Sequence, residues 1–172
     1  MQFFLLGPNI MQKKWIWTQV PYPPNTDVNY YSKEKLLEPG FCVKAEYDYG
    51  NKAGDFLGNS ALLTIVSPRL AEILRTCADI GTYKVELTGI DTPFEYVGIV
   101  VRSKSHPFDP VLSKAEYSET GSLSDYNGIY FSNWNGDDII YINEMPKLFI
   151  VSEKVLDLLI KAKVTHSIYK TI

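Results

Sequence analysis

The sequence predicts an α+β fold of mostly antiparallel sheet, with two strand–serine–helix units packed on one core. The first observation is a C-terminal unit, residues 147–163, where an apolar run of strand length stops at Ser152 and helical spacing begins at once. The second is an upstream unit, residues 61–79, in which Ser67 stands 85 residues before its counterpart. The third is that helices follow only some of the strand patterns, which argues against a doubly wound parallel sheet.

The helices of the two units carry apolar residues at the same positions, spaced i, i+3, i+4 and i+7 on one face. Each serine is placed to accept a hydrogen bond from a free backbone N–H of the first helical turn, so both are predicted N-caps. Pro68 follows Ser67 at the first helical position, where its missing N–H costs nothing. The side chains expected to be buried on these faces are Leu70, Ile73, Leu74, Val155, Leu158 and Leu159.

The other elements are shorter, and period-two alternation or short apolar runs predict them as strands. In chain order, the predicted strands are residues 3–6, 15–20, 41–49, 83–87, 94–102 and 167–169. A proline-rich extended segment at 21–24 precedes a single predicted helical turn at 32–37.

Residues 103–125 are expected to form a long loop, because prolines, glycines and serines interrupt every periodic pattern there. One short helix near 111–117 is predicted within it. Farther on, the runs 129–131 and 139–142 flank an Asn-Gly pair, and such a pair between two β-type runs predicts a hairpin. A loop region of this length in a compact domain is commonly functional.

Composition predicts a single globular domain over residues 1–172, with 45% hydrophobic and 22% charged residues. No apolar run approaches the roughly 18–20 residues needed to span a membrane. The apolar run at 1–6 lacks a basic flank and ends at Gly7-Pro8, so we expect no signal peptide and a cytoplasmic protein. The net charge of −3 argues against a general nucleic-acid binder.

The search for catalytic and metal-binding patterns gives little. The sequence has no phosphate-binding loop, no nucleophile elbow and no metal-type spacing of His and Cys. A Cys–His pair made by Cys42 or Cys77 with His106 is one interpretation, and a core cysteine with an exposed loop histidine is the other. The run 125–128 begins like a calcium loop but lacks the later oxygen ligands. We therefore expect no cofactor and no metal.

One acidic and aromatic stretch differs in composition from the rest of the sequence. Residues 109–144 contain seven acids and one base, a net charge of −6, so the rest of the chain carries +3. Acids steer a basic partner over distance, and Tyr and Trp are frequent interface anchors. The alternative interpretation is a solvated loop with its aromatics folded inward. The predicted partner-binding residues are Glu116, Glu119, Asp125, Tyr126, Tyr130, Trp134, Asp137 and Asp138, with the last two as first choice for direct contacts at a hairpin tip.

The pattern Phe-Ile-Val-Ser-x-x-Val-x-x-Leu-Leu at 149–159 resembles the closing segment of certain α+β immunity proteins of bacterial polymorphic toxin systems, the families numbered eleven and forty-three. The size of the chain and its aromatic-rich strands also fit these families. The resemblance implies a cytoplasmic, non-enzymatic protein that neutralises a cognate toxin by stoichiometric occlusion. Together with the acidic stretch, it predicts a basic toxin site, such as the phosphate-binding cleft of a nuclease.

Two other functional classes stay open. One is a small enzyme of unrecognised type that uses the Cys–His pair, and the other is an adaptor module of a secretion apparatus. The enzyme would react selectively with thiol reagents near neutral pH. The adaptor would bind a secretion component rather than a toxin.

Overall fold

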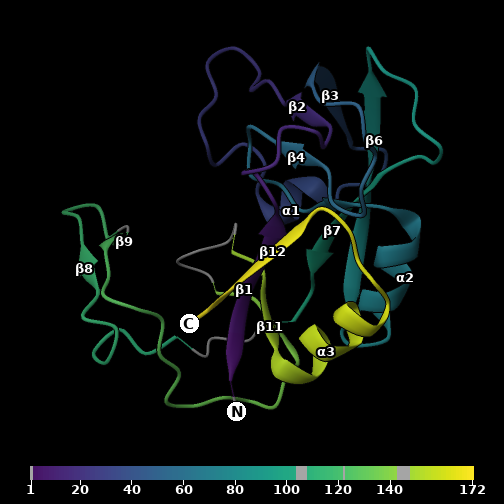
Figure 1. Ribbon diagram of the computed structural model, residues 1–172. Coiled ribbons are helices and arrows are strands. Elements are labelled where there is room, and N and C mark those ends of the chain that lie inside the picture. Colours follow the sequence, from purple (N-terminus) through teal and green to yellow (C-terminus); the bar gives the residue numbers. More distant parts are fainter. Residues whose placement is uncertain (1, 104–107, 122, 143–147) are drawn as a thin grey trace.

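The computed structural model describes residues 2–103, 108–121, 123–142 and 148–172, whose strands form two main sheets and a small hairpin (Figure 1). The first sheet is antiparallel throughout, in the order β10 (Ile139–Ile140), β11 (Ile150–Ser152), β1 (Phe3–Pro8) and β12 (Ser167–Thr171). The second sheet has the order β4 (Gly58–Asn59), β2 (Trp17–Gln19), β3 (Cys42–Tyr49), β6 (Ile80–Thr88), β7 (Val97–Val101) and β5 (Ile65–Val66).

The second sheet is mixed, because β2 pairs with β4 and β3 pairs with β6 in parallel while its other pairs are antiparallel. A separate hairpin consists of β8 (Glu116–Tyr117) and β9 (Leu123–Asp125). The helices are α1 (Lys33–Leu36), α2 (Pro68–Arg75) and α3 (Glu153–Lys161). The predicted α+β class is confirmed.

Serine caps begin both longer helices, as the sequence predicts. The Ser67 side chain accepts a hydrogen bond from the backbone N–H of Leu70 at 3.2 Å, and Ser152 accepts one from Val155 at 3.4 Å. Each serine is extended, with ψ near 154° and 161°, which turns the chain from strand into helix within one residue. The change of hydrophobic period at these serines therefore marks a real change of structure.

The two strand–serine–helix units have the same topology. In the first, β5 leads through α2 to β6, and β7 lies between the two strands, antiparallel to both. In the second, β11 leads through α3 to β12, and β1 occupies the middle place, again antiparallel to both. The middle strand follows its unit in the first case but comes from the other end of the chain in the second. The first sheet therefore joins the two ends of the chain.

The largest apolar cluster lies between the two units and includes both helices. It holds Leu70 and Leu74 of α2 together with Val155 and Leu159 of α3, all at most 3% exposed. Ile73 packs against this cluster and is half-buried. The prediction for Leu158 is wrong: its side chain is 38% exposed. The buried residues of α3 are Val155, Leu156 and Leu159, so Leu156 faces the core where Leu158 was expected.

Two predicted features of the central region are also wrong. No helix forms near 111–117, where turns lead into β8. The runs 129–131 and 139–142 do not form a hairpin with each other: Phe131 forms a bridge with Phe108, and β10 pairs with β11. The turn near the Asn-Gly pair exists, but Ile139 and Ile140 are fully buried, and their burial selects a long-range partner over the adjacent run.

We expect Leu159→Ala to lower the free energy of unfolding by about 2–5 kcal/mol, because the side chain is nearly inaccessible and its removal leaves a cavity. Leu158→Ala on the same helix should cost less than about 1 kcal/mol. Urea denaturation of both variants measures the difference. Equal losses at the two positions would contradict the observed orientation of α3.

Candidate functional site

The predicted partner-binding residues lie on an insertion between β7 and β10, of which residues 108–121 and 123–138 are described. In Figure 1 its β8–β9 hairpin stands away from the two main sheets. Glu144, the last acid of the predicted stretch, lies outside the described residues. The insertion thus projects from the sheets at its hairpin and carries most of the predicted site.

The hairpin brings two acids together. Glu116 of β8 and Asp125 of β9 are direct partners in its register, and both are exposed. Like charges directly opposite each other on neighbouring strands oppose pairing, so nothing in the hairpin itself favours this arrangement. Glu119 is exposed at the turn that joins the strands. A cation placed over the hairpin would relieve this repulsion.

Large apolar and aromatic side chains accompany the acids at the surface. Tyr126 is 40% exposed and Tyr130 is 52% exposed. Val111 is 83% and Leu112 55% exposed, at the turn where the insertion begins. Exposed apolar groups among charges are typical of an interaction surface. The alternative in which the aromatics fold beneath the loop is therefore wrong for these tyrosines.

Trp134 and Asp137 belong to a closed loop near the body of the protein. The Trp134 indole N–H donates to the backbone carbonyl of Asp137 at 2.9 Å, and its ring packs edge-on against Phe3 with centroids 5.8 Å apart. The side chains of Asn135 and Asp137 also bond to each other. Trp134 is 36% exposed and Asp137 is half-buried, so both present only part of their surface to a partner.

Asp138, predicted as a first-choice contact, is bonded within the protein and is mostly buried. Its carboxylate accepts hydrogen bonds from the Ser152 hydroxyl at 2.8 Å and from the Lys154 ammonium at 2.6 Å. The bonds from Lys154 and Ser152 lower the pKa of Asp138, although its partial burial opposes this shift. Asp138 therefore holds the start of α3, and a charge reversal there would disturb the fold.

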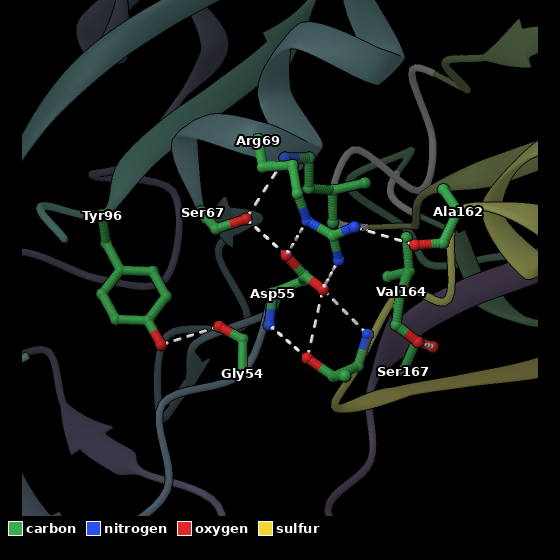
Figure 2. Close-up of polar contacts among 10 residues, drawn as sticks. Gly54, Asp55, Ser67, Arg69, Tyr96, Ala162, Val164 and Ser167 are labelled. Carbon is green, nitrogen blue, oxygen red and sulfur yellow. Dashed lines mark hydrogen bonds and ion pairs between the residues drawn. The ribbon is translucent and has the colours of Figure 1, made fainter. Parts of the chain in front are cut away.

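Asp55 holds the start of α2 in the same way (Figure 2). Its carboxylate accepts from the Ser67 hydroxyl at 2.7 Å and from the Arg69 guanidinium, as Asp138 does from Ser152 and Lys154. In both units the serine N–H also donates to the aspartate carbonyl, at 2.7 Å and 2.8 Å. Neither aspartate role was predicted. The sequence does contain a signal for both roles, because the run Asp55-Phe56-Leu57 precedes the first unit as Asp138-Ile139-Ile140 precedes the second. A basic residue also stands two positions after each serine.

The Asp55 network also joins the two units. The backbone N–H of Thr165 donates to the Asp55 carboxylate at 2.9 Å, and Arg69 donates to the carbonyl of Ala162 at the end of α3 at 2.8 Å. Burial alone would raise the pKa of Asp55, but the hydrogen bonds from Arg69, Ser67 and Thr165 outweigh it and hold this pKa below its ordinary value. The carboxylate is thus a buried charge with its partners in place.

The side chains considered for catalysis do not assemble a site among the described residues. Cys42 and Cys77 are half-buried, and the Cys77 thiol donates to the carbonyl of Ile73 in its own helix at 3.6 Å. His106 lies outside the described residues. The other histidine, His166, is buried, stacks on Trp15, and has Nδ1 2.6 Å from the Phe56 carbonyl. Within the described part of the chain, no three His, Cys, Asp or Glu residues are grouped to hold a metal ion.

A cavity of about 440 Å³ lies between α1, the turn at 62–64 and the β10–β11 end of the first sheet. Its wall is largely apolar and includes Tyr31, Tyr83 and Tyr126. Burial raises the pKa of Tyr31 and Tyr83, so both phenols stay neutral at physiological pH. Tyr126 belongs both to this wall and to the insertion. A pocket of this size accepts a large side chain or a small ligand.

A comparison with known proteins finds no family model and no curated protein that matches this sequence. Among the residues that the structure describes, none of the helices has the length and apolar character needed to cross a membrane.

We expect Asp55→Asn to lower the free energy of unfolding at pH 7 and to flatten its dependence on pH. A carboxyl whose pKa is lower in the folded state stabilises the fold above its unfolded pKa, about 3.9, and this contribution is lost as the pH falls through the folded value. The gap between wild type and variant in urea denaturation should therefore shrink from pH 5 to pH 2.5. Asp91→Asn, at an exposed loop position, is the matched control and should follow wild type.

Proposed function

We propose that this protein is a protein-binding inhibitor that neutralises a cognate bacterial toxin by covering its active site. The observation that carries the proposal is the projecting insertion, which carries both exposed acids and exposed aromatic and apolar side chains. The C-terminal resemblance to immunity proteins supports the same class. The partner is a basic toxin domain, for example a nuclease with a phosphate-binding cleft.

The charge distribution supports a basic partner. Between residues 109 and 138 the chain has six acids and one base, Lys114. Asp138 is engaged with Ser152 and Lys154, but Glu116, Glu119 and Asp125 are exposed. The opposed pair Glu116 and Asp125 is unfavourable in the free protein, and a cationic partner converts this repulsion into attraction.

The exposed apolar groups supply the short-range part of the contact. Tyr126 and Tyr130 bracket the Gly128 turn, and Val111 and Leu112 lie on the preceding turn of the same insertion. Tyrosine buries a large area while losing few rotatable bonds, so two such residues are effective anchors. Acids therefore accelerate encounter, and the aromatic groups hold the complex. A rise in salt should slow association much more than it speeds dissociation.

The test begins with the toxin domain encoded beside the gene for this protein. We expect Glu116→Lys combined with Asp125→Lys to weaken binding to that domain at least tenfold, because it replaces an acidic pair with a basic one. The matched control is Asp91→Lys with Glu95→Lys, which reverses two exposed acids on the β6–β7 loop. Isothermal titration calorimetry measures affinity, and survival of cells that co-express the toxin measures protection.

Unchanged affinity of the Glu116/Asp125 variant would place the interface elsewhere on the protein. Loss of affinity in both double variants would show a general effect of net charge. The absence of any toxin domain in the neighbouring gene would contradict the immunity class itself.

A further inference from the structure

The two units differ at one edge. In the first unit, the outer side of β6 is covered by β3, which runs parallel to it from Cys42 opposite Lys84 to Glu46 opposite Thr88. In the second unit, β12 holds the place of β6, and it is the last strand of its sheet (Figure 1). No described strand pairs with its outer side. Four of its five residues are exposed.

The hydrogen bonds of β12 identify the backbone groups at this open edge. The backbone N–H of Ile172 donates to the carbonyl of Phe3, and that of Asn9 donates to the carbonyl of His166. The backbone groups of the even-numbered residues of β12 therefore bond to β1. Bonded and non-bonded pairs alternate along an antiparallel ladder. The N–H and C=O groups of Ser167, Tyr169 and Thr171 therefore face outward. Opposite Ser167 lies Pro8, which has no N–H to donate, as a non-bonded position allows.

The other free edges offer much less. The outer strands β4, β5 and β10 have two residues each, and β8 and β9 of the small hairpin have two and three, whereas β12 has five. Short edge strands are a usual means of preventing addition of another chain. The β12 edge is also flanked by exposed apolar side chains, Ile168 at 46% and Tyr169 at 51%.

The segments at the start of this edge are basic, whereas its far end, at Ile172, packs in the apolar cluster that includes Leu123 and Phe131 of the acidic insertion. Residues 1–26 contain two lysines and no acid, and residues 158–172 contain three lysines and no acid. These lysines are all exposed, and they are Lys13, Lys14, Lys161, Lys163 and Lys170. The segment around Lys14 lies near the start of β12, because the neighbouring Trp15 ring stacks on His166 with centroids 5.2 Å apart.

We propose that β12 binds an extended, acidic peptide segment of another protein, which adds to the sheet as a parallel strand. The parallel direction follows from β3, the strand that fills the equivalent place beside β6. The acidic character follows from the lysines, and charge pairing across the strands has a precedent in Lys44 of β3, which lies opposite Glu86 of β6. Backbone pairing supplies affinity in this mode of recognition, and side chains supply selectivity.

Two other occupants fit less well. A second copy related by a two-fold axis would pair β12 with β12 in antiparallel fashion and bring the lysines of both copies together. A nucleic acid would use the lysines but leave the open N–H and C=O groups of the strand without partners. The proposal does not involve the acidic insertion, so it stands or falls independently of toxin binding.

The probes are two eight-residue synthetic peptides, capped at both ends: Thr-Val-Glu-Val-Glu-Val-Glu-Thr and its counterpart with Lys in place of Glu. Amide NMR of the ¹⁵N-labelled full chain should show slower hydrogen exchange at Tyr169 and Thr171 when the acidic peptide is added. Its dissociation constant should be at least tenfold lower than that of the basic peptide. Thr171→Pro removes an outward N–H without removing a bond to β1, and it should weaken acidic-peptide binding at least tenfold.

A second variant, Lys163→Glu with Lys170→Glu, keeps the backbone edge and should reverse the preference between the two peptides. Equal binding of both peptides by wild type, or full binding by a folded Thr171→Pro variant, would overturn the proposal. Protection of Tyr169 and Thr171 that rises with protein concentration alone would assign the edge to a second copy and overturn it. Protection of the same amides by a single-stranded oligonucleotide would do so as well.

Discussion

The bond between an aspartate carboxylate and an N-cap serine fixes the start of each long helix, and the arrangement of the two units depends on it. The serine hydroxyl both donates to the aspartate and accepts from the first helical turn, so one side chain joins the segment that carries the aspartate to the helix. A base two residues farther on neutralises the carboxylate. Without this anchor, the apolar faces of α2 and α3 would lack a fixed direction toward the shared core.

The two aspartates are not equivalent in their surroundings. Asp55 makes three further hydrogen bonds with one residue, Thr165, and the Arg69 guanidinium that binds Asp55 also reaches the carbonyl of Ala162 at the end of α3. Among the described residues, the side-chain partners of Asp138 are Ser152 and Lys154, and Lys154 is largely exposed. A charge–charge bond open to water contributes little, whereas a buried carboxylate with its hydrogen bonds satisfied is costly to disturb. The first unit therefore carries most of the polar connection between the units.

Sequence reasoning found what local patterns determine. The serine caps and the α+β class followed from the change of hydrophobic period, which is a local property of the chain. It placed Leu158 wrongly because the ideal i, i+3 spacing puts Leu158 on the face of Val155 and leaves out Leu156, which the helix buries instead. It missed the roles of Asp55 and Asp138 at the helix starts because the capping serines lie 12 and 14 residues away, beyond any helical or strand period. The acids of the hairpin were found by composition alone, and their opposition across β8 and β9 needed coordinates.

The pairing of β1 between β11 and β12 has a consequence for the order of folding. All the strands of the first unit lie within residues 56–101, so this unit can close through short loops. The second unit needs Phe4 to meet Val151 and Thr171, contacts that span nearly the length of the chain. Closing so long a loop costs more chain entropy and slows the step, as contact order describes. During synthesis, β1 is therefore made long before its partners β11 and β12, whereas the strands of the first unit can pair once residue 101 has been added.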